Sequence, residues 1–474
     1  MRSIRTRRTT IAAIRGLAGV VAVAALAAFA PTAAGDEPDA DTPSHRESTV
    51  RAGYDYAFPL YFLSKLRWEA LETTGGRTST TLNHFAHSRS VAGPEDKWAN
   101  APLVDGLYST AWIDLAQGPV YLDTPDTGSR YYVLTLIDFY SNTFSYTGTR
   151  TTGNRAQHQL LVGPNWNGQA PAGISVIRAT TNDVYVNLRV QTSGPADQAA
   201  ANAVQDGFTI TPAPGATAGA AVARVQPGTG PENYLAVVNQ MLTVNPPPAQ
   251  DDSLIKQYRK AGICGEKCDF GKLPKPTRQT WEQVYPSLGQ YMAQYAAATA
   301  QAKGWLDYSP PGSLLGTTEQ RDYARRALSI GSGTGMLGLR REEANYWITF
   351  TDGIGRYMTG DKSYTLRLPQ GGIPAQAFWS ITLYEVSQAG QFLTPNPISR
   401  YAISGDTPGL ATNPDGSVDL AIQSQEPQDA TRNANWLPAP ANGKAFILFA
   451  RAYIPAASVI AGDFKMPQVT SAVS

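Results

Sequence analysis

The chain has 474 residues and a formal net charge of +1, with only 16% charged residues beside 23 tyrosines, 43 glycines and 34 prolines. This length is enough for two or three domains with full cores. The mixture is typical of a loop-rich β protein that meets water through uncharged polar side chains. After residue 35 the sequence contains no block of lysine or arginine, which argues against nucleic-acid binding. It also contains no run of about 18 apolar residues there, so no membrane span is predicted.

Residues 1–35 have the pattern of a secretory signal peptide. Five arginines precede a small apolar stretch at 16–30, and small residues at 33–35 offer a cleavage site. Arg7 and Arg8 leave a twin-arginine route open beside general secretion. Cleavage leaves 34 basic and 38 acidic residues. We therefore expect a secreted protein, extracellular or periplasmic.

The chain then passes from a polar stretch into a helix and a series of strands. Residues 36–52 are polar and are predicted to be a disordered tail. Apolar side chains spaced by three and four predict a helix over 53–72, which Pro59 bends or breaks. Short strands separated by turn signals follow between 80 and 190, a pattern that favours a β-sandwich.

The second half of the chain is predicted to be helical first and then rich in strands. The composition of 211–230 is that of a linker, and helix start and stop signals place most of 231–340 in helices. From 341 to 474 strands and long turns return. The predicted class is thus mainly β with a helical middle, and the N-terminal β-sandwich domain covers 53–210.

The two cysteines, Cys264 and Cys268, are four positions apart. In an oxidising compartment this spacing favours a disulfide that closes a short loop. A metal or redox pair is the alternative, although two thiols with no histidine nearby make a weak metal site.

Two apolar runs resemble each other: YYVLTLID at 131–138 and FWSITLYE at 378–385. Each begins with two aromatic residues and ends with an acid, Asp138 or Glu385. Apolar side chains on both faces predict strands inside packed sandwiches, so each acid lies where its strand leaves the core. Duplication and independent solutions to one packing problem both stay open.

These two acids have more than one interpretation. In the structural one, each carboxylate caps a turn or pairs with an arginine such as Arg130, Arg150 or Arg400. In the functional one, Asp138 and Glu385 face a cleft between the domains and act on a glycosidic bond, where the separation of the carboxylates decides the outcome. Ligand binding without catalysis is a third.

Histidines and aromatic residues supply the other candidates. His84, His87 and His158 could together form a three-histidine metal site, but ordinary polar roles are the alternative. Exposed aromatic side chains could stack on sugar rings, and polar residues on loops over a rigid sandwich are where sites form. The further candidates are Asp105 as a catalytic acid and Tyr108, Asn142, Trp379 and Tyr401 as substrate-binding residues.

Long phrases carry a family resemblance. They are DGLYSTAWIDLAQGPVYLDTPDTGSRYYVLTLIDFYSNTFSYTGTRTTG at 105–153, AFWSITLYEVSQAGQFLTPNPISRYAISGD at 377–406 and ANWLPAP at 434–440. The first resembles domain of unknown function 1254, and the others resemble its C-terminal companion, domain of unknown function 1214. The resemblance extends over 53–206 and 344–467.

The resemblance implies a fold but no reaction. It implies an immunoglobulin-like sandwich, a helical middle and a jelly-roll-like sandwich, and the family has no established common activity. His87 and Arg89 fall where members commonly show a His-x-Arg pattern, which makes both candidates for substrate binding. Leu103 and Gly106 stand where members often carry asparagine and threonine, a departure from the family pattern.

Two classes of function are therefore expected. The first is a secreted hydrolase or lyase that cleaves a glycan or another cell-envelope polymer with Asp138, Glu385 and Asp105. The second is an extracellular binding or structural protein without turnover. The expected partner is a polysaccharide or a small molecule and not nucleic acid. No cofactor is expected, although a divalent metal stays open, and the sequence leaves the oligomeric state undetermined.

Overall fold

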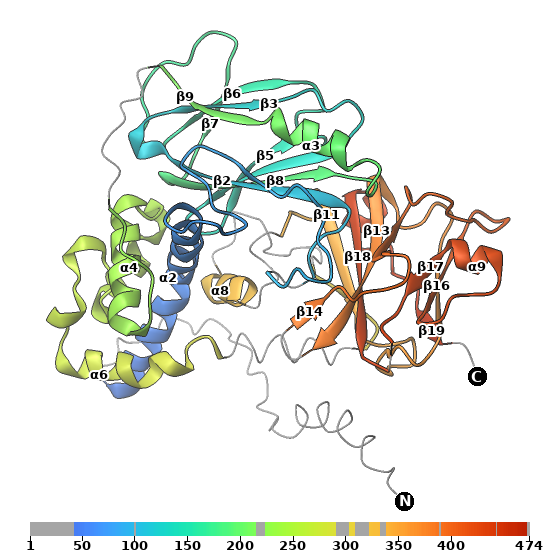
Figure 1. Ribbon diagram of the computed structural model, residues 1–474. Coiled ribbons are helices and arrows are strands. Elements are labelled where there is room, and N and C mark those ends of the chain that lie inside the picture. Colours follow the sequence, from blue (N-terminus) through green and yellow to red (C-terminus); the bar gives the residue numbers. More distant parts are fainter. Residues whose placement is uncertain are drawn as a thin grey trace, which may run out of the picture. The chain divides into compact units, whose positions relative to one another are not determined.

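The computed structural model describes residues 42–98, 101–214, 223–290, 303–308, 322–331, 338–387, 390–441 and 443–471. The predicted signal peptide, residues 1–35, lies outside these ranges. Within them the structure has sheets in both halves of the chain and helices between, and helices contribute more than the expected mainly β class implies (Figure 1). None of the helices described is long and apolar enough to cross a membrane.

The first described element is the long helix α2, Pro43–Leu71. The prediction of a disordered tail is wrong for 43–52, because the helix begins at Pro43. The polar composition of this segment suggested disorder, but burial of a few side chains is enough to hold the helix in place. Val50, for example, is buried in a hydrophobic cluster with Leu60. Pro59 lies inside the helix and does not end it.

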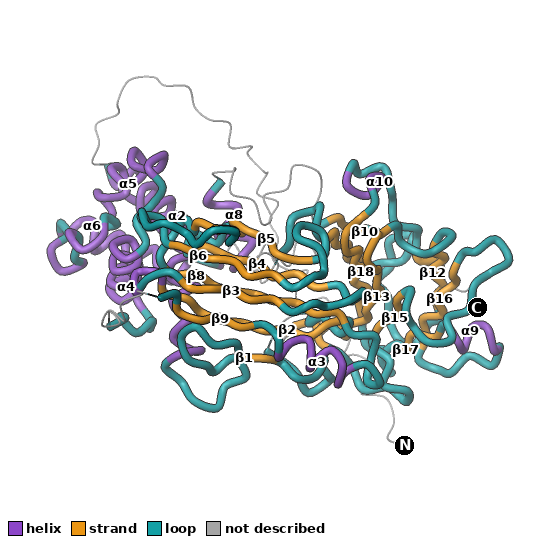
Figure 2. The backbone as a smooth tube through the Cα atoms, turned by 90° about the horizontal axis from the view of Figure 1, so that it is seen from above, coloured by secondary structure: helices purple, strands orange, loops and turns teal. Residues whose placement is uncertain are grey.

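The N-terminal β region consists of two sheets that share one core. The first has the order β1-β2-β8-β4-β5 and the second the order β7-β6-β3-β9. The strands are β1 (Ala86–His87), β2 (Gly106–Asp114), β3 (Val120–Thr124), β4 (Tyr132–Asp138), β5 (Thr143–Gly148), β6 (Gln157–Val162), β7 (Ser175–Arg178), β8 (Asp183–Gln191) and β9 (Thr209–Pro212), with helix α3 (Gln198–Asp206) before β9. Figure 1 shows the two sheets as layers, and Figure 2 looks down on them, so that their strands overlap.

Alternation along the strands builds this core. Val184, Val186, Leu188 and Val190 of β8 all point into one cluster, which also receives Leu122 of β3 from the other sheet. Side chains at the alternate positions of β8 face the opposite way. The five-stranded sheet therefore has a second face, and that face packs against the rest of the molecule.

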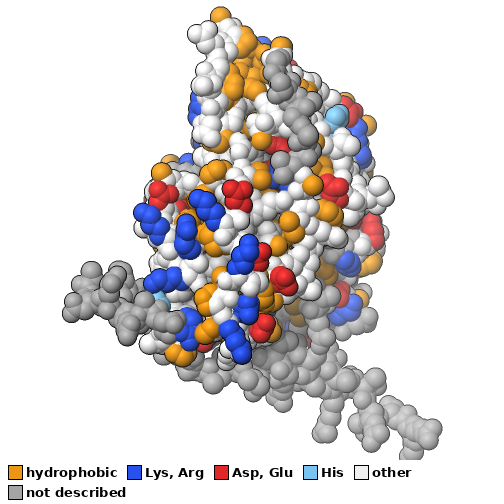
Figure 3. Space-filling model, turned by 90° about the vertical axis from the view of Figure 1, so that its left-hand side faces the viewer, with side chains coloured by type: hydrophobic (Ala, Val, Ile, Leu, Met, Phe, Trp, Pro, Cys, Tyr) orange, Lys and Arg blue, Asp and Glu red, His pale blue; other side chains and the backbone are white. Residues whose placement is uncertain are grey.

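Four further helices pack with α2 through a shared hydrophobic cluster. They are α4 (Gly230–Val244), α5 (Asp252–Tyr258), α6 (Lys275–Val284) and α8 (Tyr323–Gly331). Cys264 and Cys268 form a disulfide between α5 and α6, as the sequence predicted. Figure 3 shows the side of the molecule where these helices lie, and basic and acidic side chains are interspersed on it.

The C-terminal β region also has two sheets around one cluster. One has the order β10-β11-β18-β13-β14 with β15 paired to β13, and the other the order β17-β16-β12-β19. The elements are β10 (Trp305–Asp307), β11 (Ala344–Thr349), β12 (Tyr364–Leu368), β13 (Ala375–Ser387), β14 (Gly390–Phe392), β15 (Ala402–Ser404), β16 (Val418–Gln423), α9 (Ala430–Ala434), β17 (Trp436–Pro438), β18 (Phe446–Pro455), α10 (Ala457–Ile460) and β19 (Val469–Ser471). Strand β10 comes from the segment that was predicted to be helical, and it pairs with β11.

The second face of the five-stranded sheet meets the C-terminal sheet through a hydrophobic cluster and through polar contacts. Tyr131 packs edge-on against Phe378 with ring centroids 5.6 Å apart. The Tyr131 hydroxyl donates to Glu343 Oε1 at 2.8 Å. Arg189 of β8 donates to the Tyr346 hydroxyl of β11 at 3.0 Å. The two β regions are therefore joined by buried, specific contacts.

Candidate functional site

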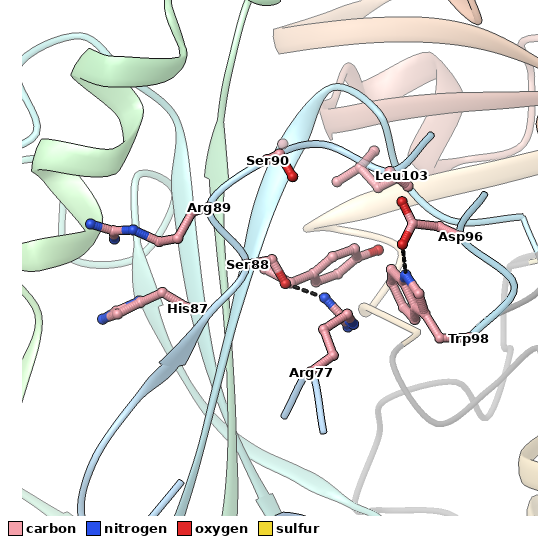
Figure 4. Close-up of a pocket in the computed structure, with 11 residues that line it drawn as sticks. Arg77, His87, Ser88, Arg89, Ser90, Asp96, Trp98 and Leu103 are labelled. Carbon is pink, nitrogen blue, oxygen red and sulfur yellow. Dashed lines mark hydrogen bonds between the residues drawn. The ribbon is translucent and has the colours of Figure 1, made fainter. Parts of the chain in front are cut away.

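A pocket of about 260 Å³ lies where strand β1 meets β2. Its lining residues come from the connection between α2 and β1, from β1 and the loop after it, and from the start of β2 (Figure 4). Its charged, aromatic and hydroxyl-bearing residues include Arg77, His87, Ser88, Arg89, Asp96, Trp98 and Tyr108. Three of the predicted substrate-binding residues, His87, Arg89 and Tyr108, thus share one pocket.

The pairing of β1 with β2 places these side chains. His87 lies opposite Ser109 in the antiparallel register. The Ser88 amide donates to the Tyr108 carbonyl at 2.8 Å, which continues the ladder. Because successive side chains of a strand point to opposite faces, His87 shares a face with Ser109, and Ser88 shares the other with Tyr108. Figure 4 shows His87 on one side of the strand and Ser88 directed toward Arg77.

One half of the pocket is a stacked arginine and tryptophan. The Arg77 guanidinium lies over the Trp98 ring, 3.5 Å from its centroid. Arg77 also donates to the Ser88 hydroxyl. Trp98 meets Tyr108 edge to face at 6.1 Å and keeps 39% of its surface exposed. Burial lowers the pKa of Arg77, because desolvation disfavours its charge.

An acid fixes the tryptophan from the loop side. Asp96 Oδ1 accepts a hydrogen bond from Trp98 Nε1 at 3.1 Å. Asp96 Oδ2 accepts from the Gly93 amide at 2.8 Å. Both carboxylate oxygens are therefore engaged inside the loop, and the indole is held in place by a charge-assisted bond.

His87 and Arg89 also line the pocket, but their side chains lie on the other side of β1 from Arg77 and Trp98 and are directed toward α3 (Figure 4). His87 Nδ1 lies 2.8 Å from Ser109 Oγ, and Gln205 Nε2 donates a hydrogen bond to the same hydroxyl at 2.8 Å. Arg89 donates to Asp206 at 2.6 Å, an ion pair near the surface. Burial lowers the pKa of His87, and the Arg89 charge adds to this effect. His87 is therefore favoured in its neutral form.

Asp138, the first predicted catalytic acid, is enclosed by hydrogen-bond donors. Its carboxylate is 3% exposed and accepts from the amides of Tyr140 and Asn142 at 2.9 and 2.8 Å. The Asn142 side chain and the Thr180 hydroxyl also donate to it. Burial raises the pKa of Asp138, while these hydrogen bonds act in the opposite direction. These contacts are those of a carboxylate that caps a turn, and Asn142 contributes to the cap through its backbone amide and its side chain.

Glu385, the second predicted acid, lies near the end of β13 and pairs with Lys444 at 2.8 Å. Its neighbours across the sheet are Phe392 and Phe446. Among the residues described, the contacts of Glu385 share no residue with those of Asp138. A cleft shared by Asp138 and Glu385 therefore stays a prediction without support from these contacts.

The other predicted residues lie in separate surroundings. Asp105 precedes β2 and is close to Ser380 and Arg451 of the C-terminal sheet, which oppose the rise that burial causes in its pKa. Trp379 is 5% exposed and donates to the Gly371 carbonyl at 3.0 Å, so it has no open face for a ligand. Tyr401 is half-buried beside another apolar cluster of the C-terminal region.

The predicted histidine alternative, a three-histidine metal site, is not formed. His84 bonds to Thr81 in the turn after α2, and His158 of β6 pairs with Asp123. Across the described ranges no group of three or more histidine, cysteine, aspartate or glutamate side chains is arranged to hold a metal ion.

Sequence reasoning missed Arg77 and Trp98, which shape the pocket. Both lie in polar loops without periodic pattern, so they offered little signal. The one usable sign was Trp98 itself, because a large aromatic residue in the polar stretch GPEDKW has no strand or helix face to bury it.

These elements define a protein with two β regions, helices between them, and a pocket of arginine and aromatic side chains beside the contact of the two regions. Residues 82–212 match the family model described as protein of unknown function DUF1254, and residues 343–457 match the model of protein of unknown function DUF1214. The chain belongs to this two-domain family, as its sequence phrases predicted.

Solved structures are similar to this chain over most of its length. The crystal structure of the VPA0106 protein from Vibrio parahaemolyticus covers 90% of this chain and all of its own, with a TM-score of 0.68 and 21% identity. An uncharacterised protein from Burkholderia cenocepacia covers 91% of this chain and 93% of its own, with a TM-score of 0.43 and 12% identity. No curated protein matches the chain. The Vibrio structure therefore supports the fold alone.

Proposed function

We propose that this is an exported binding protein that holds a small carboxylate-bearing ligand, an acidic sugar in the simplest case, in the pocket around Arg77 and Trp98. The observation that carries the proposal is the state of Arg77. Its guanidinium is oriented by Trp98 and Ser88, yet it forms no ion pair in the part of the chain that the structure describes. The charge of Asp96 acts on Arg77 without direct contact, because both of its carboxylate oxygens bond to Gly93 and Trp98. A partly desolvated cation of this kind gains from a counter-charge.

The chemistry of the pocket favours a carboxylate on a ring. A stacked arginine keeps its in-plane N–H groups available, and their fork matches a carboxylate with two parallel hydrogen bonds. Trp98 and Tyr108 offer apolar surface for a sugar ring, and Ser88 offers a hydroxyl. The volume of about 260 Å³ is slightly below that of most ligand pockets, which span about 300–1,000 Å³, so a single ring fits better than a long chain.

Export and the finer fold names are parts of the same proposal. The disulfide between Cys264 and Cys268 supports an oxidising compartment. We propose an immunoglobulin-like sandwich for the N-terminal sheets and a jelly-roll-like sandwich for the C-terminal ones, on the support of one shared cluster for each pair. Glycan cleavage by Asp138 and Glu385 stays a prediction, and the Asp138 carboxylate is already engaged by hydrogen bonds from Asn142 and Thr180.

Calorimetric titration of residues 36–474 with D-glucuronate, D-galacturonate and D-glucose tests the proposal. We expect a uronate to bind and glucose to bind at least tenfold more weakly. Arg77→Gln should lose most of the uronate affinity. Arg155→Gln, which changes an exposed arginine in a loop, should bind as the wild type does.

Two results would count against the proposal. One is an absence of uronate binding by the wild type. The other is equal affinity of the two arginine variants, once circular dichroism and thermal unfolding have shown that both are folded.

A further inference from the structure

The loop that carries the pocket is fastened to the C-terminal sheet. We define the pocket loop as residues 88–98 together with residues 101–104. The Ala101 amide donates to the Gln391 carbonyl at 3.0 Å. The Ala101 carbonyl accepts from Arg451 at 3.0 Å, and the Pro102 carbonyl accepts from the Tyr384 hydroxyl at 2.7 Å.

Side chains of the pocket loop add to these backbone bonds. Two residues that line the pocket, Ala92 and Leu103, belong to apolar clusters that contain residues of the C-terminal sheet. The Lys97 ammonium lies 4.5 Å from the centre of the Phe392 ring. Trp98 therefore lies in the sequence between attachments to the C-terminal sheet on both of its sides.

The two side chains that hold the loop are themselves held rigidly. Tyr384 is fully buried, and its hydroxyl accepts from Arg451 at 3.0 Å while it donates to Pro102. Arg451 is 4% exposed, donates to Thr382 at 2.9 Å and lies 4.2 Å from the Phe449 ring centre. Because buried polar groups are costly to leave without partners, these bonds fix the loop in one position.

We propose that Tyr384 and Arg451 are positioning residues for the pocket, so that ligand binding at Arg77 and attachment of the pocket loop to the C-terminal sheet are thermodynamically coupled. This proposal rests on the proposed function for its ligand. Neither residue lines the pocket. They act through the loop, and linkage requires that a ligand which favours the attached loop also stabilises the attachment itself.

Hydrogen exchange followed by mass spectrometry, together with titration of D-glucuronate, tests this coupling with two matched variants. Tyr384→Phe removes the hydroxyl that holds Pro102. Tyr364→Phe removes the hydroxyl of another buried tyrosine of the same domain, whose hydrogen bonds within the described residues are to Thr359. We expect faster exchange in peptides covering 91–98 and glucuronate binding weaker by about 3- to 10-fold for Tyr384→Phe alone.

Glucuronate should also slow exchange in wild-type peptides that cover 384–393, on the C-terminal side of the attachment. The proposal is overturned if Tyr384→Phe leaves exchange at 91–98 as slow as Tyr364→Phe does. It is also overturned if the two variants bind glucuronate equally. If the wild type binds no glucuronate, the proposed function fails, and the exchange at 91–98 still decides whether Tyr384 positions the loop.

Discussion

Replacing Arg150 by methionine removes the guanidinium beside a buried carboxylate at the contact of the two β regions. Arg150 Nε lies 2.6 Å from Glu343 Oε2, and the side chains are 28% and 1% exposed. Loss of one member of a fully buried ion pair costs about 3–5 kcal/mol. Because Arg150 is partly exposed and Tyr131 still donates to Glu343, we expect a loss of about 2–3 kcal/mol in the free energy of unfolding at pH 7.

The dependence on pH makes this prediction specific. Burial raises the pKa of Glu343, and Arg150 is the chief opposing influence, so its removal raises that pKa further. A carboxyl group whose pKa is higher in the folded than in the unfolded protein stabilises the fold progressively as pH falls. The difference between wild type and Arg150→Met should therefore narrow between pH 7 and pH 5, by no more than about 1.4 kcal/mol per pH unit.

Urea unfolding followed by circular dichroism at both pH values provides the measurement. Arg367→Met is the matched control, because Arg367 pairs with Asp415 at the surface, where the two side chains are 57% and 61% exposed. That change should cost less than about 1 kcal/mol. A loss for Arg150→Met no larger than for the control, or a difference that stays constant with pH, would refute the reasoning.

Three more outcomes follow from the described contacts. Hydrogen bonds from Arg130 lower the pKa of Asp197, so this pair stabilises the fold above about pH 4 and loses its effect as the pH falls further. The stabilities of wild type and Asp197→Asn, measured by acid unfolding, should therefore converge below about pH 4. A stability difference that stays constant with pH would contradict this prediction. Trp281 is fully buried and donates to a backbone carbonyl, so Trp281→Ala should cost about 3–5 kcal/mol in urea unfolding, and an unchanged midpoint would show that its packing is dispensable. Replacing Cys264 and Cys268 by serine should lower the free energy of unfolding by about 2 kcal/mol, because the disulfide closes a short loop. Reductant should lower the thermal unfolding temperature of the wild type and not that of the double variant. An equal effect on both proteins would contradict the prediction.

Local patterns in the sequence predicted that both the N-terminal and the C-terminal parts of the chain form strands. The two similar runs became β4 and β13, and every residue of β4 is buried, as apolar side chains on both faces predicted. The acids at their ends were predictable only in part. Asp138 caps its own turn, which was one of the alternatives that the sequence left open, and it also accepts a hydrogen bond from Thr180. Glu385 pairs with Lys444 and not with an arginine. Thr180 and Lys444 are both distant in the sequence, so no local pattern identifies them.

The pocket was predictable in part for the same reason. His87, Arg89 and Tyr108 were candidates because they lie in phrases that resemble a family, and pairing of β1 with β2 brings them together. Arg77 and Trp98 come from loops whose path depends on tertiary contacts, and no local pattern encodes such a path. The start of α2 was missed because burial of a few side chains, Val50 among them, outweighs polar composition.

Strand β10 has a practical consequence for cutting the chain into expressible pieces. Trp305, Leu306 and Asp307 pair with β11, and the Trp305 indole donates to the Pro467 carbonyl at 2.7 Å. A fragment that starts at 341, where composition changes, would leave the edge of β11 with open backbone groups. Such an edge recruits strands from other chains, so this fragment should aggregate. A boundary upstream of residue 303 keeps the edge covered.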